Sequence, residues 1–453
     1  MDPILAGDLA RFPDLLTAVR DQAVKVLASL DDRPVALPAE PPSPQALPQQ
    51  GAGLEAALDR FAERWQDRMS GSAGPRYLGF VTGGATPAAV AGDWLTSTLD
   101  QNLSSGAGSG APDLERETVR WLRDLFGLPG TFSGSFVTGA TMSNFVGLAL
   151  GRQWYGERYG VDAAEDGLRN VPPLRVLSGT PHSSIVKATS MLGIGRGQVR
   201  VLPTLPGREA VDLAALEAAL AEGPAIVVAN AGTVNTVDFD DLRAIADLKR
   251  RYPFWLHVDG AFGLFAALSG EHAPLLDGLG EADSVCADLH KWLNVPYDAA
   301  VQFTRRPDLQ VAVFRNSAAY LGDPGENPDF MHLTPENSRR FRALPAWFAL
   351  TAYGANGHRE IVERNVAAAR RLGELLGTVP GVRLLAPVRM NVVCFAIEGD
   401  VPAALRAVTA TGRTFLTPTV YDGQPGIRAA FSNWRTTVQD AEEIFETLRT
   451  VLS

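Results

Sequence analysis

Cysteine is scarce in this chain of 453 residues: the two present, Cys286 and Cys394, are far apart and each lies inside an apolar run. We therefore expect two small buried hydrophobic side chains, and neither a disulfide framework nor a structural metal. Long apolar runs are missing too, since no segment approaches the roughly 20 residues that span a bilayer. Charged residues interrupt the first thirty positions and leave no signal-peptide core. We expect a cytoplasmic protein without membrane contact.

Clusters of basic residues are also missing. The formal net charge of −10 is spread along the chain, whereas a nucleic-acid interface needs a basic patch, so we expect no nucleic-acid partner. The motifs G-x-G-x-x-G after a strand, G-x-S-x-G and H-E-x-x-H do not occur, which argues against nicotinamide, serine-hydrolase and metalloprotease sites. Hydrophobic residues make up 46% of the chain, enough for a large core. A globular enzyme of another class is expected.

Apolar periodicity divides the chain into three parts. Helical stripes over residues 12–30 and about 54–69, joined by a proline-rich connector, predict an N-terminal helical arm over residues 1–70. In residues 71–343 short apolar runs alternate with helical patterns, which predicts an α/β domain with a mainly parallel sheet and helices on both faces. Residues 344–453 predict a long helix followed by a small α+β domain. The predicted strands are 175–178, 225–229, 255–259, 283–287 and 299–303.

Two charged residues stand at the ends of predicted buried strands. Asp259 closes W-L-H-V-D, and Lys291 follows the next strand within A-D-L-H-K-W-L-N-V-P-Y-D. Taken singly, Asp259 is an ordinary turn or capping residue and Lys291 an ordinary surface lysine. Taken together, they supply a carboxylate for a ring nitrogen and an amine for an aldehyde, which are the two groups that pyridoxal phosphate requires.

Two further segments fit the same cofactor. Gly139, Ala140 and Thr141 form a small turn before a helical pattern that runs on from Asn144, and a helix start of this kind can bind a phosphate. His182 follows a predicted strand in P-H-S-S-I-V-K-A and can lay its imidazole on a bound ring. A generic helix start and a satisfied polar histidine are the simpler interpretations. The position at the carboxyl ends of predicted strands favours a ligand site.

Five motifs stand in the order found in the group II pyridoxal-phosphate-dependent amino acid decarboxylases, the family of aromatic amino acid and glutamate decarboxylases, which this chain closely resembles. They are T-G-A-T-M-S-N, H-S-S-I-V-K-A, N-A-G-T-V-N-T-V-D, H-V-D-G-A-F-G and H-K-W-L-N-V-P-Y-D. The resemblance runs from about Tyr77 to Arg342 and weakens toward the C-terminus. It implies an aspartate-aminotransferase-like fold (fold type I), decarboxylation of an L-amino acid, and a homodimer that uses the N-terminal arm and has active sites near the interface.

The resemblance also implies roles for the residues around the cofactor ring. Lys291 would form the Schiff base with pyridoxal phosphate, and Trp292 would pack to hold that lysine. Asp259 would keep the pyridine nitrogen protonated. His182 and Ala261 would sandwich the ring.

Other roles concern the substrate and the phosphate. His290 would lie near the substrate carboxylate and Thr233 near the aspartate that faces the ring nitrogen. Residues 139–141, with Asp288, would surround the phosphate, and Asn144 is included among the cofactor-binding residues. Asp288 departs from the family pattern, because relatives often carry asparagine there, and its role stays open.

One family residue is missing from a loop. The family carries a tyrosine that protonates the substrate carbon, just before an R-R-F-R helix start, which here is residues 339–342; counting back places Phe330 at its position. Phenylalanine has no proton to give. Either His332 or His182 supplies the proton, or the carbanion reacts with O₂ and an aldehyde forms; in that second case Phe330→Tyr should shift the products toward amine. Tyr320 lies too early in the loop.

The substrate pocket is described only by the resemblance. Thr82, Thr86 and Asn102 would line it, partly across the dimer interface, although a glycine-rich turn and an ordinary helix would also explain them. Arg428 either binds the substrate, as in many enzymes of the wider fold, or forms a structural ion pair. The substrate amino acid stays open, as do a transaminase, a carbon–carbon lyase, and a binding module that kept the fold without catalysis.

Overall fold

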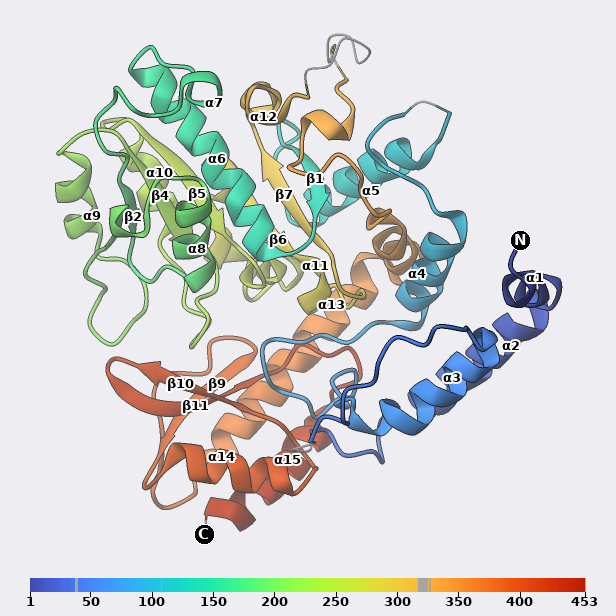
Figure 1. Ribbon diagram of the computed structural model, residues 1–453. Helices are drawn as coiled ribbons and strands as arrows, with labels where there is room; N and C mark the ends of the chain where they lie inside the picture. Colours follow the sequence, from blue (N-terminus) through green and yellow to red (C-terminus); the bar gives the residue numbers. More distant parts are fainter. Residues whose placement is uncertain (37–39, 107, 317–324, 326, 453) are drawn as a thin grey trace.

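The computed structural model describes residues 1–36, 40–106, 108–316, 325 and 327–452. Tyr320 lies outside the described residues. The chain forms a helical arm, a large domain around a seven-stranded sheet, and a small domain with a four-stranded sheet (Figure 1).

The large sheet has the strand order β1-β7-β6-β5-β4-β2-β3. Neighbours from β3 to β6 are parallel, while β7 runs antiparallel to both β6 and β1. All five predicted strands are present. β1 and β3 were not predicted, because β1 begins with Ser-Gly-Ser and β3 is a largely exposed edge strand of three residues. The bounds are β1 Ser133–Val137, β2 Val176–Ser178, β3 Val199–Val201, β4 Ala225–Asn230, β5 Phe254–Asp259, β6 Ser284–Asp288 and β7 Ala300–Thr304.

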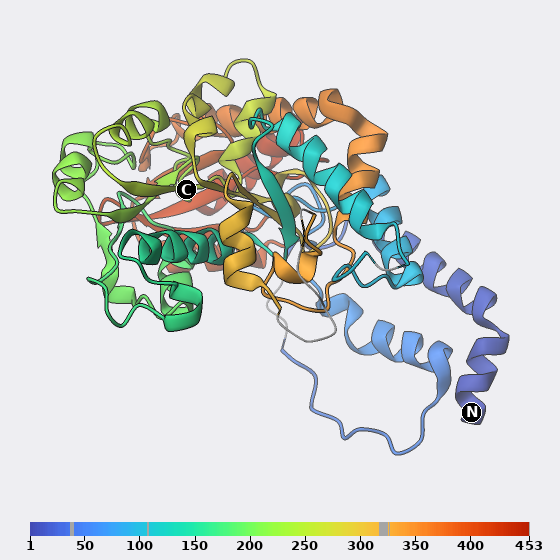
Figure 2. The same cartoon turned by 90° about the horizontal axis from the view of Figure 1, so that it is seen from above.

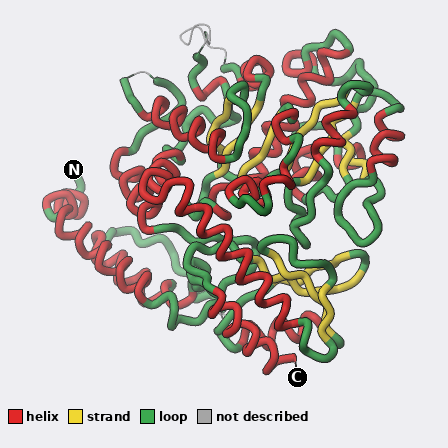
Figure 3. The backbone as a smooth tube through the Cα atoms, turned by 180° about the vertical axis from the view of Figure 1, so that it is seen from behind, coloured by secondary structure: helices red, strands yellow, loops and turns green. Residues whose placement is uncertain are grey.

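Helices cover both faces of this sheet, as the view from behind shows (Figure 3). Alternate strand residues enter two cores: Trp255 packs with α6 on one face, and Leu256 packs on the other. The mixed sheet between helical layers confirms the predicted fold class. The helices of the large domain are α4 Pro87–Leu99, α5 Ala111–Leu125, α6 Ala140–Arg158, α7 Ala163–Asp166, α8 Ser183–Met191, α9 Leu213–Leu220, α10 Leu242–Leu248, α11 Leu289–Trp292 and α12 Pro307–Phe314.

The small domain carries an antiparallel sheet of order β10-β11-β9-β8. α13 (Ala343–Leu376) joins the two domains, because its residues up to Val366 belong to the large core and those from Ala368 belong to the small core. The expected domain boundary between residues 343 and 344 stays a prediction. The other elements are β8 Val382–Leu384, β9 Val392–Ile397, α14 Val401–Ala410, β10 Thr417–Tyr421, β11 Gln424–Ala430 and α15 Val438–Leu452.

The N-terminal arm projects from the body of the molecule (Figure 2). It consists of α1 (Pro3–Ala10), α2 (Phe12–Ala28) and α3 (Gly53–Arg64), followed by a short 3-10 turn. The apolar stripe of α2 is uncovered, and Leu16 is 50% exposed. A stripe of this kind needs a partner surface.

The described part of the chain contains two free cysteines but no disulfide, membrane-spanning helix or metal-binding cluster. Both cysteines are buried and free, as predicted. Among the described residues no helix is long and apolar enough to cross a membrane, and no cluster of His, Cys, Asp and Glu side chains could hold a metal ion.

A buried ion pair anchors the segment that leads into α13. Arg339 Nη2 lies 2.9 Å from Glu115 Oε1, and neither side chain has exposed surface. The carboxylate also accepts a hydrogen bond from the backbone N–H of Phe136, and Arg339 donates to the carbonyl of Phe136. The guanidinium stands 4.8 Å from the ring centroid of Phe330. These contacts fasten the segment to α5 and β1.

Removing one partner of this pair should destabilise the protein. Arg339→Met leaves the Glu115 charge buried and unpaired, which costs about 3 to 5 kcal/mol. The matched control is Arg340→Met, which removes a partly exposed pair with Asp93 and should cost less than about 1 kcal/mol. Urea denaturation midpoints of the two variants measure the difference. Equal midpoints would contradict the anchoring role.

Candidate active site

The candidate residues gather at the carboxyl ends of the central strands. Asp259 closes β5 and Asp288 closes β6, while His182 follows β2, Thr233 follows β4 and Gly139 follows β1. This edge of the sheet lies toward the small domain (Figure 1). Ligands of open α/β sheets bind at the carboxyl edge.

Lys291 is held on α11, the short helix directly after β6. Its Nζ lies 3.3 Å from Asp288 Oδ2 and 5.4 Å from the ring centroid of Phe262, and its side chain is 17% exposed. Trp292 next to it is buried, and its Nε1–H donates to Asn365 Oδ1 on α13 at 2.8 Å. The lysine is therefore positioned by a fixed helix while its amine stays reachable.

Asp259 presents a carboxylate without a cationic partner. The residue is 7% exposed, and its Oδ2 accepts from Asn144 Nδ2 at 2.9 Å while Oδ1 accepts from the backbone N–H of Ala261 at 3.2 Å. No Lys, Arg or His of the described residues forms an ion pair with it. A buried carboxylate is costly unless a cation or donors compensate, so this site fits the protonated ring nitrogen of pyridoxal phosphate.

His182 caps the start of α8 and keeps an exposed surface. Its Nδ1 accepts from the backbone N–H of Ser184 at 3.3 Å and lies 2.8 Å from Ser184 Oγ. Desolvation by the surrounding protein lowers the pKa of His182; Asp259 opposes this shift, and Lys291 and Arg428 reinforce it. A neutral imidazole with an open face fits stacking on a cofactor ring.

His290 and Asp288 flank the lysine. His290 Nδ1 lies 3.2 Å from Asp288 Oδ1, and the His290 ring centroid is 4.2 Å from that of Tyr297. Burial lowers the pKa of His290, and Asp288 opposes the shift. Asp288 therefore approaches the two basic side chains on α11. Its place beside the phosphate stays a prediction.

The start of α6 is open for an anion. α6 begins at Ala140 with Gly139 as its N-cap and without a side-chain cap. The backbone N–H groups of Ala140 and Thr141 find no acceptor within the described chain, and residues 139–141 are partly exposed. Helix N-terminal N–H groups and the helix dipole favour a phosphate here.

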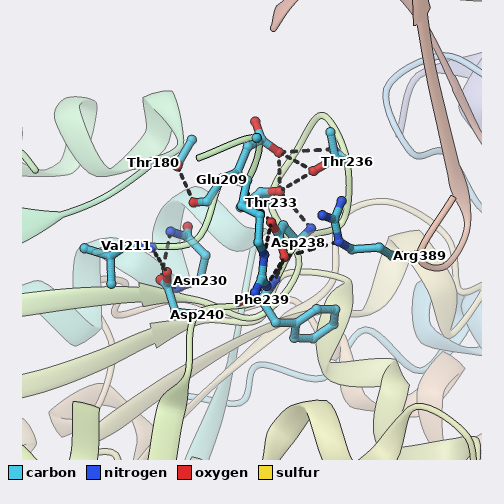
Figure 4. A network of polar contacts seen from close by, with 12 residues as sticks. Thr180, Glu209, Val211, Asn230, Thr233, Thr236, Asp238, Phe239, Asp240 and Arg389 are labelled. Carbon is cyan, nitrogen blue, oxygen red and sulfur yellow. Dashed lines mark hydrogen bonds and ion pairs between the residues drawn. The ribbon is translucent and has the colours of Figure 1, made fainter. Parts of the chain in front are cut away.

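Thr233 is held by a carboxylate that the sequence analysis missed. Its hydroxyl donates to Glu209, which also accepts from Thr236 Oγ1 at 2.7 Å and from Asn235 Nδ2 at 3.0 Å (Figure 4). No hydrogen bond within the described residues joins Thr233 to Asp259. Glu209 stands in a loop without motif or periodicity, so nothing in the sequence marked it.

A second layer of carboxylates supports this loop (Figure 4). Asp238 pairs with Arg208 at 2.6 Å and lies 3.4 Å from Arg389. Asp240 accepts from the backbone N–H groups of Val211 and Asn230, each at 2.7 Å. Burial raises the pKa of Asp240 to about 6 in spite of these donors. The loop after β4 is thus fixed by polar contacts.

Arg428 reaches the same loop from β11. Its Nη1 donates to the carbonyl of Val234 at 2.7 Å, while its Nε is buried without a partner. Over the part of the chain that the structure describes, no carboxylate forms an ion pair with Arg428, so the structural ion pair is not observed. Burial lowers the pKa of Arg428.

The three expected substrate residues differ in their hydrogen bonds. Thr82 Oγ1 lies 3.4 Å from Tyr297 Oη, beside the His290 ring. Thr86 caps α4, and Asn102 Oδ1 accepts from the backbone N–H groups of Ser104 and Arg339. Thr86 and Asn102 are therefore engaged in local backbone bonds. Their substrate role stays a prediction.

The two loop residues make their contacts with other parts of the large domain. Phe330 is 2% exposed, and its ring centroid lies 5.3 Å from the guanidinium carbon of Arg116 and 4.8 Å from that of Arg339. His332 Nδ1 accepts from the backbone N–H of Asn316 at 3.0 Å. Within the described residues, no hydrogen bond, ion pair or ring contact links either residue to Lys291 or Asp259. Their catalytic roles stay predictions.

His257, two residues before Asp259, was also missed. Its ring is fully buried and lies 2.9 Å from Asn144 Oδ1 through Nε2 and 2.8 Å from Ser284 Oγ through Nδ1. Burial lowers the pKa of His257 to about 4, and Asp259 opposes the shift. The period of two along a strand places His257 and Asp259 on one face and could have revealed it.

His257 should make the cofactor-free protein sensitive to acid. Its pKa of about 4 in the folded state lies below the unfolded value of about 6.5, so the unfolded state binds more protons between these limits. Stability is retained above pH 6.5 and falls by about 3 kcal/mol on the way down to pH 4. His257→Gln should lose less stability over this window in urea denaturation. An equal loss would contradict the neutral state of His257.

Comparison with known proteins extends the motif analysis. A family profile described as "Pyridoxal-dependent decarboxylase conserved domain" matches residues 40–398. The chain is 27% identical over 422 residues to an aromatic-L-amino-acid decarboxylase of Bacillus atrophaeus, covering 88% of this chain and 86% of that protein. It is 32% identical over 431 residues to human cysteine sulfinic acid decarboxylase, covering 89% and 84%.

A solved structure agrees in fold. The crystal structure of Oryza sativa TDC with pyridoxal phosphate and tryptamine superimposes with a TM-score of 0.89 at 23% identity, covering 100% of both chains. The fold class, enzyme class and cofactor expected from the five motifs are confirmed. The chain belongs to the family of pyridoxal-dependent decarboxylases.

Proposed function

We propose that this protein removes the carboxyl group of an L-amino acid as CO₂, with pyridoxal phosphate held at Lys291. The convergence of three groups at the carboxyl edge of one sheet carries the proposal. The Lys291 amine is reachable, the Asp259 carboxylate is buried without an ion-pair partner among the described residues, and His182 keeps an exposed surface.

The cofactor supplies an aldehyde that condenses with amines and a ring that withdraws electrons from the substrate carbon. Lys291 Nζ provides the amine on the protein side. Asp259 Oδ2, fixed by Asn144, holds the proton on the ring nitrogen. The N–H groups of Ala140 and Thr141 hold the phosphate.

The substrate carboxylate needs a cationic or donating partner on the open side of the site. Arg428 supports this role because its buried Nε has no hydrogen-bond partner among the described residues and its charge contributes to lowering the pKa of His182. His290 stands next to Lys291 on α11 and directs its ring toward Tyr297 and Thr82. These groups orient the bond to be broken.

After CO₂ leaves, formation of an amine requires a proton at the substrate carbon. His182 is better placed than His332 to give it. The His182 ring is exposed and close enough to Lys291 and Asp259 for both charges to shift its pKa. His332 is 4% exposed and accepts a hydrogen bond from Asn316. We therefore expect an amine product with His182 as the proton source.

A second outcome is an aldehyde, and the phenyl ring at Phe330 is the observation that favours it, because this ring cannot donate a proton. The balanced reaction consumes the amino acid, O₂ and water and releases aldehyde, CO₂, ammonia and hydrogen peroxide. Oxygen takes two electrons from the substrate carbon. Peroxide therefore distinguishes the two routes.

A homodimer accompanies this proposal. The exposed stripe on α2, with Phe12 at 49%, Leu16 at 50% and Leu27 at 44% exposure, needs an apolar partner surface. A second copy of the arm offers the same stripe. Self-association through equal patches is the usual arrangement of a twofold dimer.

Lys291→Ala should abolish both turnover and the yellow colour of the lysine-bound cofactor, because it removes the amine that would form the Schiff base. Lys187→Ala is the control, since Lys187 is an exposed lysine on α8. Absorbance spectra and CO₂ release measure both variants. Retained colour and turnover in Lys291→Ala would refute the proposed site.

Product analysis in air should give amine and CO₂ in equal amounts without peroxide for the amino acid that is turned over. Phe330→Tyr should leave this ratio unchanged, because the ring is buried and packs against the guanidinium groups of Arg116 and Arg339. Chromatography of amine and aldehyde with a peroxide assay measures both proteins. Aldehyde and peroxide from the unmodified protein, turned to amine by Phe330→Tyr, would establish the oxidative route instead.

A further inference from the structure

Helix α6 lies unusually close to strand β5. A Cβ atom on Gly147 would come within 2.5 Å of the His257 ring, and one on Gly151 would come within 2.9 Å of Trp255 Cδ1. Asn144, Gly147 and Gly151 share one helical stripe at spacings of three and four. Alternate residues of β5 face that stripe. The two glycines let the Asn144 amide reach the polar groups of the strand.

Donor and acceptor chemistry gives these contacts one direction. The NH₂ group of Asn144 donates to Asp259 Oδ2 at 2.9 Å, so the Oδ1 atom of the amide faces His257. His257 Nε2 must then carry the proton that Oδ1 accepts. In the neutral imidazole Nδ1 then carries no proton, so it accepts a hydrogen bond from the hydroxyl of Ser284. Trp255 Nε1–H donates to Ser284 Oγ at 3.1 Å and completes the chain.

A branch of the same chain reaches the cofactor-stacking histidine. The second N–H of Asn144 donates to Ser184 Oγ at 3.0 Å. Ser184 then donates its own hydroxyl proton to His182 Nδ1, which also accepts the Ser184 backbone N–H. The proton of neutral His182 is therefore on Nε2, the atom free of these bonds. One amide group serves both functional side chains.

We propose that His257 and Asn144 are positioning residues whose one-way hydrogen-bond chain orients the Asp259 carboxylate as an acceptor for the ring nitrogen of pyridoxal phosphate. The chain holds the amide of Asn144 with its NH₂ toward Asp259. Without the N–H of His257 Nε2 as a donor, the Asn144 amide could rotate and place its oxygen against Asp259. The amide oxygen and the carboxylate would then repel each other. This inference rests on the proposed role of Asp259.

The test compares two cofactors in each protein: pyridoxal phosphate and its analogue with CH in place of the ring nitrogen. Only the first can bond to Asp259, so the ratio of their dissociation constants reports that contact. His257→Phe keeps an aromatic ring at this position, although a larger one, and removes both nitrogens. It should reduce the preference for pyridoxal phosphate roughly tenfold, as expected for one charged hydrogen bond, and leave the affinity for the analogue unchanged.

His257→Gln is the conservative control. Its amide can place an N–H where Nε2 stands, so it should keep most of the preference. Ser284→Ala is a second variant in case His257→Phe does not fold, and it should reduce the preference in the same direction by freeing His257 to change tautomer. Thermal unfolding of each cofactor-free protein reports structural damage. Such damage would weaken the binding of both cofactors to the same extent.

Asp259→Ala separates the role of Asp259 from that of the hydrogen-bond chain. A preference lost in Asp259→Ala and in His257→Phe, and kept in His257→Gln, supports the chain. A preference lost in Asp259→Ala but intact in His257→Phe, or in Ser284→Ala if the first variant does not fold, overturns the chain and leaves the role of Asp259 standing. A preference unchanged in Asp259→Ala overturns both.

Discussion

Asp259 brings a carboxylate to the end of a buried strand, where little of it meets water. The free energy cost of this charge is offset by the N–H groups of Asn144 and Ala261 and by no ion pair in the described part of the chain. A cation on the cofactor side of Asp259 would compensate the rest of this charge. A pyridine nitrogen that holds its proton would supply that cation, and in the proposed site this would link the affinity for the cofactor to its electron-withdrawing power.

The loop after β4, which carries Thr233, is bonded both to Glu209 and to the small domain. Glu209 accepts hydrogen bonds from this loop on one side. Arg428 donates to Val234 from β11, and Thr419 donates to Asn235 from β10. A movement of the small domain would therefore shift this loop as well as the guanidinium proposed for the substrate carboxylate.

The segment before α13 is held by different forces. Phe330 packs against two guanidinium groups, and Arg339 closes a fully buried ion pair with Glu115. Buried pairs of this kind fix geometry more than they add stability, because desolvation offsets their attraction. The segment consequently belongs to the framework of the large domain, and the histidine after β2 becomes the better candidate for moving a proton.

The sequence by itself determined the central strands, the glycine turn before α6 and the Asp259 and Lys291 pair, because apolar runs, turn residues and strand ends are local patterns. It did not reveal the edge strands β1 and β3, whose exposed or small residues carry no such pattern.

Only the tertiary structure decided which polar groups meet. Asn144 bonds to Asp259 across 115 positions of sequence, Thr233 bonds to Glu209 instead, and Phe330 packs beneath Arg339. Such contacts depend on strand order and on how closely a helix approaches the sheet. Both are set by packing of the whole core, which no short stretch of sequence contains.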